Sequence, residues 1–174
     1  MPEPLVPSTG IGVLHLFCRT TPTTDRAAVR AAADAAAAEG LDVVPVATLG
    51  HKADVALMAL GPDTWALKRF QTAVEAAGLD VVDSYVSLTE LSEYAKGLPE
   101  KMANDRLYPK LPPPGMTAWC FYPMSKRRDP EQNWYALPFE DRKELMHEHG
   151  ASGRTFAGRI VQLITGSTGI DDYE

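Results

Sequence analysis

The stretch LDVVPVATLGHKADVALMAL, residues 41–60, decides the fold expected for this chain. It holds two apolar runs, 41–49 and 53–60, which are joined by the short turn 50–52. Short apolar runs bounded by turn residues are typical of buried β-strands. We therefore expect two consecutive strands here, with any helices of the same unit placed outside the pair.

Helical patterns lie on both sides of this strand pair. An alanine-rich run, residues 25–39, precedes it and ends at Gly40. Alanine has the highest helix propensity, and glycine commonly follows the last turn of a helix. A second helix is predicted to start at Pro62–Asp63 and to end at Gly78, with apolar residues at helical spacing between them.

Two further strand-like runs lie outside these helices, IGVLHLFCRT at 11–20 and LDVVDSYVSL at 79–88. The resulting order is β-α-β-β-α-β, which is the ferredoxin-like unit, so the fold class is α+β. One face of such a sheet stays uncovered unless a second unit or a second chain packs on it. We assign residues 10–95 to this N-terminal unit.

The second half of the chain predicts a connector and half of another unit. The connector, residues 96–116, contains the end of a polar helix predicted over 91–107 and three consecutive prolines, which form a stiff extended segment. In the C-terminal unit, residues 117–174, a strand is predicted at 117–126, a helix at 139–150 and a strand at 159–166. This β-α-β order is the first half of a second ferredoxin-like unit. We expect either that another chain completes this unit or that the sequence is a truncated version of a longer protein.

Composition excludes several classes of function. The net charge of −6 argues against a general nucleic-acid or membrane-surface binder, and no stretch has the apolar length needed to cross a bilayer. Cys18 and Cys120 lie far apart without metal-like spacing, which is typical of reduced thiols, and the N-terminus lacks the pattern of a secretion signal. We expect a cytoplasmic protein whose local basic cluster, residues 126–128, binds a small anion.

That basic cluster follows a run of aromatic residues in the predicted strand 117–126. Alternate side chains share one face of a strand, so Tyr122, Met124 and Lys126 are expected together, opposite Trp119 and Phe121. One interpretation is a pocket wall that carries a reactive phenol and a cation. The other is a half-buried tyrosine beside solvated charges, and the strand pattern alone favours this second interpretation.

Two polar residues fall on predicted apolar faces. His149 lies three and four residues after Met146 and Leu145, which places it on the apolar face of the helix 139–150. Such a histidine is suited to be an axial iron ligand, although spacing alone favours a hydrogen-bonded core histidine. Gln162 shares a strand face with Ile160, so its amide needs a partner in the core or in a ligand.

Four stretches carry a resemblance to a known family: GHKADVALMALGPD (50–63), DSYVSLTELSEY (83–94), AWCFYPMSKRR (118–128) and NWYALPFEDRKELMHEHGASGRTFAGRIVQLITGSTGIDDYE (133–174). They resemble the actinobacterial coproheme decarboxylases of the chlorite dismutase-like superfamily. The motif YPMSK with a later EHG is specific to that family. The resemblance implies a dimeric α/β barrel, in which each subunit pairs two ferredoxin-like units, and assembly of the subunits into homopentamers.

The resemblance also implies a reaction, the oxidative decarboxylation of iron coproporphyrin III (coproheme) to haem b. Hydrogen peroxide is the oxidant, two propionates become vinyl groups, and the substrate acts as its own redox cofactor. By resemblance, Tyr122 removes hydrogen as a radical, Lys126 holds a propionate and His149 is the axial iron ligand. The further substrate-binding positions implied are Pro123, Met124, Ser125, Trp134, Gln162 and Arg106. The implied transient partner is the coproporphyrin ferrochelatase that supplies coproheme.

Two features depart from the family pattern. No histidine lies between His51 and His147 to serve as a distal base, so either another group such as Asp105 does that work or peroxide activation is weak. Family members also continue with a strand, a helix and a strand beyond the last residue here. Two other functions stay open: a chlorite dismutase or haem peroxidase, and a non-catalytic haem-binding module.

Overall fold

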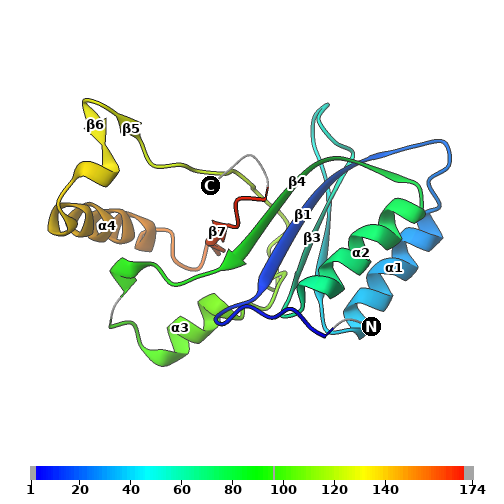
Figure 1. The fold of residues 1–174 in the computed structure, drawn as a ribbon, viewed down its shortest axis with the longest axis horizontal. Coiled ribbons are helices and arrows are strands. Elements are labelled where there is room, and N and C mark those ends of the chain that lie inside the picture. The colour runs from blue at the N-terminus through cyan, green and yellow to red at the C-terminus, as the bar shows by residue number, and fades with distance from the viewer. Residues whose placement is uncertain (1–2, 96, 171–174) are drawn as a thin grey trace.

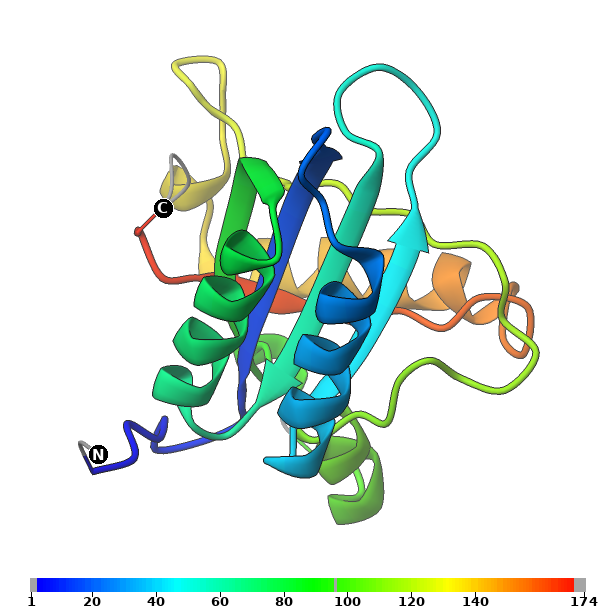
Figure 2. The same ribbon diagram turned by 90° about the vertical axis from the view of Figure 1, so that its right-hand side faces the viewer.

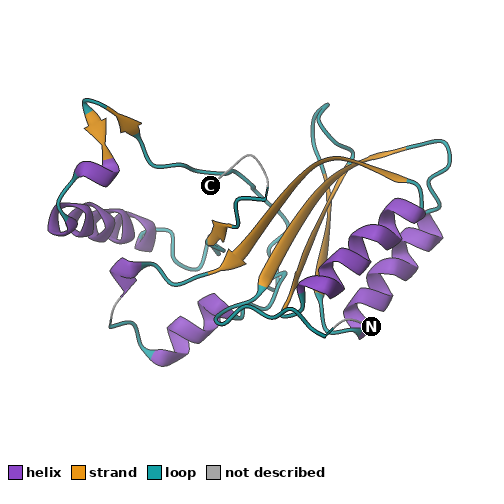
Figure 3. Cartoon of the chain, in the orientation of Figure 1, coloured by secondary structure: helices purple, strands orange, loops and turns teal. Residues whose placement is uncertain are grey.

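The structure, a computed structural model, describes residues 3–95 and 97–170. Figures 1 and 3 show its elements, which are, in chain order, β1 (Gly12–Thr20), α1 (Arg26–Ala38), β2 (Asp42–Ala47), β3 (Val55–Gly61), α2 (Thr64–Ala76), β4 (Leu79–Thr89), η1 (Glu93–Ala95), α3 (Glu100–Leu107), β5 (Arg128–Asp129), β6 (Gln132–Asn133), η2 (Trp134–Ala136), α4 (Phe139–Arg154) and β7 (Thr165–Ser167). The first six have the predicted order β-α-β-β-α-β.

The main sheet has the strand order β2-β3-β1-β4-β7, and each pair of neighbours is antiparallel. Its first four strands have the arrangement of a ferredoxin-like unit, with β1 and β3 in the centre. In this register His15 lies opposite Met58 on one side and Tyr85 on the other. A side chain of β1 is therefore flanked by both neighbouring strands.

Helices α1 and α2 lie side by side over one face of the sheet (Figure 2). Each begins at an aspartate that satisfies free backbone N–H groups of the first turn. The Asp25 carboxylate accepts hydrogen bonds from the N–H groups of Ala27 and Ala28 at 2.9 and 3.1 Å. Asp63 accepts one from the N–H of Trp65 at 3.0 Å. The predicted helix starts are thus confirmed.

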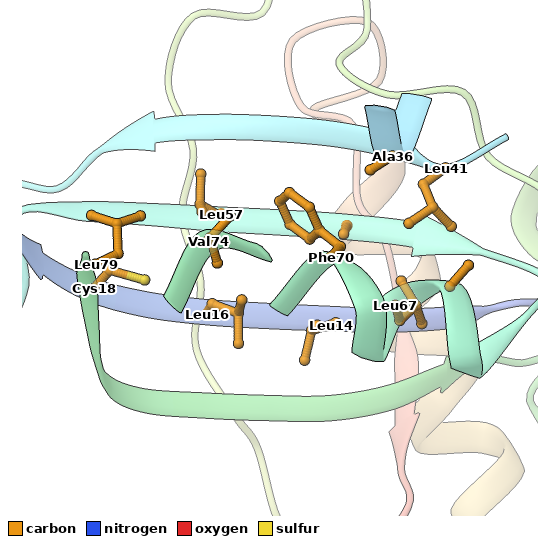
Figure 4. Packing of buried hydrophobic residues seen from close by; sticks show 12 residues of the cluster. Leu14, Leu16, Cys18, Ala36, Leu41, Leu57, Leu67, Phe70, Val74 and Leu79 are labelled. Atoms are coloured by element: carbon orange, nitrogen blue, oxygen red, sulfur yellow. The ribbon is translucent and has the colours of Figure 1, made fainter. Parts of the chain in front are cut away.

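The core lies between these helices and the sheet (Figure 4). Alternation along β1 turns Leu14, Leu16 and Cys18 toward the helices. Phe70 and Val74 of α2 pack onto them and are 2% and 0% exposed. Burial of apolar surface on this scale is the main favourable term in folding, so this layer forms the stable base of the molecule.

The opposite face of the sheet is covered by the second half of the chain, which lies on the other side from α1 and α2 (Figure 1). A smaller buried cluster there contains Val13 and Met58. Leu111, Trp119 and Leu163 pack against this cluster. The uncovered face anticipated from the sequence is therefore covered by residues that follow α3.

The predicted class, a mixed α+β protein built on a ferredoxin-like unit, is confirmed. The predictions of two strands in the second unit were wrong. Residues 117–126 form no strand, and of the run 159–166 only its end enters the short β7. A strand needs a neighbour for its backbone groups, and β7 obtains one from Ser87–Thr89 of β4. Likewise, the helix predicted over 91–107 is divided into η1 and α3. The domain boundaries placed at 95 and 116 stay predictions.

Candidate functional site

The segment that carries the predicted catalytic residues is anchored to the sheet by aromatic rings. Trp119 and Phe121 stack on each other, with ring centroids 5.7 Å apart and an angle of 10° between their planes. Phe121 lies 4.6 Å from the imidazole of His15, 5.1 Å from Phe17 and 5.6 Å from Tyr85. Such ring pairs stabilise a contact beyond the area they bury, so the chain is fixed here without a β-ladder.

Side chains on the other side of this segment face solvent. Tyr122 is 61% exposed and Met124 is 71% exposed, and Lys126 is also exposed. The alternation expected of a strand is therefore seen although the strand is not, because Trp119 and Phe121 occupy the inner positions. The phenol of Tyr122 and the ammonium group of Lys126 are both accessible to solvent in this segment.

Lys126 contacts two elements that follow it in the chain. Its Nζ lies 4.3 Å from the ring centroid of Trp134, in cation–π geometry, and 3.9 Å from the Sδ of Met146. The backbone N–H of Trp134 donates to the carbonyl of Arg127 at 2.9 Å, which holds the indole next to the lysine. Met146 lies three residues before His149 on α4, so both occupy one face of this helix. Lys126 is thereby placed beside the part of α4 that bears His149.

Helix α4 places His149 at its accessible surface. The helix has Glu140 and Asp141 in its first turn and Arg154 in its last, an arrangement that suits the helix dipole. The inward orientation predicted for His149 was wrong for the described chain, since His149 is exposed and Leu145 is 47% exposed. No residue of α4 is buried, because no described segment covers the face that carries Leu145 and His149.

Gln162 and Arg106 lie apart from this group. Gln162 is exposed and outside any strand, and Ile160 and Ile164 beside it are 62% and 53% exposed, so the strand face predicted for them was wrong. Arg106 lies in the last turn of α3, which Figures 1 and 2 show well away from the β5–β6 hairpin. Asp105, the candidate distal base, is exposed and bonded to Lys101 at 2.7 Å. Pro123 and Ser125 lie in the anchored segment between Tyr122 and Lys126.

A second cluster, which the sequence did not predict, adjoins Trp134. The ring of Tyr94 stacks on Phe139 with centroids 5.4 Å apart and meets Trp134 edge-on at 6.2 Å. Arg142 lies above Tyr94 and reaches Glu93 at 3.6 Å. Desolvation of the phenol raises the pKa of Tyr94, and the Glu93 carboxylate acts in the same direction. Tyr94 ends one of the stretches that carried the family resemblance, which was the available signal for this cluster.

An open pocket of about 240 Å³ lies against this second cluster. It is lined by Glu93, Tyr94, Phe139, Lys143 and His147. None of the residues predicted to be catalytic lines it, so it does not form the predicted substrate site. It lies on the side of α4 that carries His147.

Two buried titratable groups of β1, His15 and Cys18, are suited to packing. His15 is 6% exposed, and burial lowers its pKa to about 4, so its imidazole is neutral at neutral pH. Burial, together with nearby carboxylates, raises the pKa of the Cys18 thiol to about 11, which leaves it unreactive. In the described part of the chain no helix has the length and apolarity to span a membrane.

The exposed residues match the chemistry of an iron porphyrin. Within residues 3–95 and 97–170, no three metal-ligating side chains gather into a group. A haem iron can be held by one axial imidazole from the protein, and the exposed His149 has the side chain for this role. The phenol of Tyr122 and the ammonium of Lys126 supply a redox-active group and a partner for a carboxylate. The donor set therefore fits an iron porphyrin with carboxylate side chains.

Comparison with known proteins gives the family. The model of the chlorite dismutase family matches residues 24–174. The chain is 43% identical to the coproheme decarboxylase of Staphylococcus carnosus over 137 residues, which is 72% of this chain and 53% of that protein. It is 44% identical over 154 residues to a Natronomonas pharaonis protein to which heme binding is provisionally assigned, covering 79% of this chain and 25% of that protein. The chain thus spans about half and a quarter of the lengths of these two curated relatives.

A solved structure agrees with the sequence comparisons. The heme-binding protein of Thermus thermophilus superposes with a TM-score of 0.79 at 30% sequence identity. This likeness covers 100% of the present chain and 78% of the Thermus chain. The ferredoxin-like sheet, the anchored aromatic segment and the family match over most of the sequence lead to one conclusion. The chain belongs to the chlorite dismutase family.

Proposed function

We propose that this protein catalyses the peroxide-dependent oxidative decarboxylation of iron coproporphyrin III to haem b. For each of two propionates, one hydrogen peroxide and one proton are consumed. The propionate loses its carboxylate as carbon dioxide and becomes a vinyl group, while the peroxide is reduced to two waters. The similarity to a coproheme decarboxylase supports this choice of substrate.

The position of Lys126 is the observation that carries the proposal. Its ammonium lies over Trp134 and beside Met146, on the helix that carries His149. A propionate bound by Lys126 would therefore belong to a porphyrin whose iron is within the range of α4. Tyr122, which is exposed in the same segment as Lys126, takes the role of removing a hydrogen atom from that propionate.

Further substrate-binding residues belong to the proposal. Pro123, Met124 and Ser125 lie between the two catalytic residues and would line the porphyrin edge. Gln162 and Arg106 enter the proposal from the family resemblance alone. The same holds for hydrogen peroxide as oxidant, for a homopentamer and for a coproporphyrin ferrochelatase as the supplier of substrate.

The test is an anaerobic titration with iron coproporphyrin III, followed by stepwise hydrogen peroxide and mass analysis of the porphyrin. Successive loss of two carboxyl groups is expected. Tyr122→Phe should bind the porphyrin and leave its mass unchanged. Tyr135→Phe is the matched control, because Tyr135 is 55% exposed and lies nearby in η2, and it should react like the unmodified protein.

Other outcomes would identify a different function. A bound porphyrin whose mass never changes, with Tyr122 present, would contradict the proposal and indicate a haem-binding module. Release of oxygen from chlorite by the haem-loaded protein, without decarboxylation of coproheme, would indicate a chlorite dismutase instead.

A further inference from the structure

The side chain of Lys126 rests on the aromatic ring of Trp134. The Nζ of Lys126 lies 4.3 Å from the ring centroid, within the distance at which a cation is attracted to an aromatic face. A lysine side chain has many rotamers, and fixing it costs conformational entropy whenever it binds a ligand. If the ring of Trp134 already restricts the ammonium group, less conformational entropy is lost when Lys126 binds a ligand. This holds only where the ring of Trp134 is itself fixed.

Tyr94 packs against the same indole ring. Its ring meets Trp134 edge-on at 6.2 Å with an angle of 78° between the planes, and it stacks on Phe139 at 5.4 Å. Tyr94 therefore contacts both Trp134 and Phe139, the first residue of α4. The guanidinium of Arg142, from the next turn of α4, closes the cluster over Tyr94 at 6.0 Å.

Tyr94 itself is held by the N-terminal unit. It lies in η1, a few residues after Thr89, the last residue of β4, which is only 2% exposed. The turn is closed by Ser92, whose carbonyl accepts from the N–H of Ala95 at 2.8 Å and whose Oγ accepts from the N–H of Tyr94 at 3.3 Å. The backbone of Tyr94 is thus held in a hydrogen-bonded turn that follows β4 closely in the chain.

We propose that Tyr94 is a positioning residue through which the first ferredoxin-like unit holds Trp134, and with it Lys126, in place to bind a substrate carboxylate. This inference rests on the proposed function for the identity of the carboxylate, a porphyrin propionate. Tyr94 acts through Trp134 and Lys126 and does not itself touch the reacting group. The ring is the essential part, so phenylalanine should replace tyrosine at this position.

The first test needs no porphyrin. The chain has three tryptophans, so a ¹H–¹⁵N spectrum shows three indole N–H signals. Lys126→Ala removes the cation from the face of Trp134 and should shift its signal. In a Tyr94→Leu background the same Lys126→Ala change should shift that signal about threefold less, as expected for coupled neighbours. In a Tyr94→Phe background the full shift should return.

Controls separate positioning from general damage. Tyr108→Leu removes a tyrosine that is 46% exposed at the end of α3 and should leave the Lys126-dependent shift unchanged. The signals of Trp65 and Trp119 report on α2 and on the sheet. If Tyr94→Leu does not fold, Phe139→Leu removes the stacked partner of Tyr94 and should reduce the shift in the same way. A Lys126-dependent shift of full size in the Tyr94→Leu protein, or in the Phe139→Leu protein where that replaces it, would overturn the proposal.

Porphyrin binding provides the second test. Lys126→Ala should weaken the affinity for iron coproporphyrin III, and this loss should shrink by about threefold in a Tyr94→Leu background, because the two changes remove the same interaction. Additive losses would overturn the inference. If the unmodified protein binds no porphyrin, the proposed function fails, while the indole signals still decide whether Tyr94 positions Lys126.

Discussion

The imidazole of His15 lies 4.6 Å from the ring of Phe121, so the residue directly before Tyr122 is packed against the central strand of the sheet. The accessible phenol thus stands next to one of the well-packed points in the second half of the chain. For the role proposed for Tyr122 a fixed backbone is favourable, because part of the orientation is then set before the substrate binds.

Phe121→Ala should destabilise the protein by about 2–3 kcal/mol, at or below the lower end of the range for buried phenylalanines, since Phe121 is only partly buried. The loss arises from its contacts with His15, Phe17 and Tyr85. Urea unfolding measures it. Phe156→Ala is the control, because Phe156 is 46% exposed and should change stability by no more than about 0.5 kcal/mol. Equal losses in the two variants would contradict the anchoring role of Phe121.

Acid should weaken the fold through His15. Its pKa is 6.5 in the unfolded chain and about 4 in the folded protein, because burial disfavours the charged imidazole. Between these values the unfolded state binds more protons, so stability falls as the pH decreases from 6.5 and stops falling, for this group, near 4. The full loss corresponds to about 3 kcal/mol.

The pH effect can be isolated by substitution. His15→Phe removes the titrating group and keeps a ring among its aromatic neighbours. Unfolding free energies measured above pH 6.5 and near pH 4 should therefore differ less in His15→Phe than in the unmodified protein. An identical pH dependence in the two proteins would show that His15 is not the group responsible.

Thr89 joins three segments of the chain through one buried hydroxyl. Its Oγ1 accepts from the N–H of Ile11 at 2.8 Å and donates to the carbonyl of Leu107 at 2.7 Å. Thr89→Val leaves both backbone groups without this partner and should cost about 2–3 kcal/mol, because each unpaired buried group costs about 1–3 kcal/mol. Thr155→Val removes a bond of the same 2.7 Å length from an exposed site and should have little effect. Similar melting temperatures for the two variants would refute this account.

Lys126→Met should weaken binding of iron coproporphyrin III by about 10- to 100-fold, because a charge-assisted hydrogen bond contributes about 1.5–3 kcal/mol. The aliphatic stem is retained, so the loss reports on the removal of the positive charge, including its cation–π contact with Trp134. Lys110→Met, at another exposed lysine, is the control and should bind normally. The difference between the two variants should decrease at high salt, where the attraction is screened. An equal loss in both would indicate a general charge effect.

The sequence predicted the N-terminal unit well because its signals are local. Asp25, Asp63 and Gly78 mark helix ends through their own backbone chemistry, and alternation along β1 follows from strand geometry. The strands expected at 117–126 and 159–166 failed for the opposite reason. Their residues have strand-like composition, but a strand also depends on a neighbour that local sequence does not specify.

In the candidate site, too, the features set by local sequence were predicted and those set by contacts between distant segments were not. The outward position of Tyr122, between the inner residues Trp119 and Phe121 and the accessible Met124, was anticipated from the sequence, since alternation is a local property. Tyr94 and His15 were not recognised as neighbours of the site, because their contacts with Trp134 and Phe121 arise only when distant parts of the chain meet. The exposed position of His149 depends likewise on what packs over α4.

The pairing of β7 with β4 has a consequence for the order of folding. Thr168 donates to the carbonyl of Val86, a partner 82 positions away in the sequence. Closing a loop of that length costs entropy before any hydrogen bond forms, and the cost is similar for β1 and β4, whose partners Gly12 and Leu88 lie 76 positions apart. The ladder between β1 and β4 contains nine residue pairs, however, whereas β7 pairs with three residues of β4. The longer ladder offsets the entropy of closure better, so the first unit should form early and serve as the template on which β7 joins the sheet last.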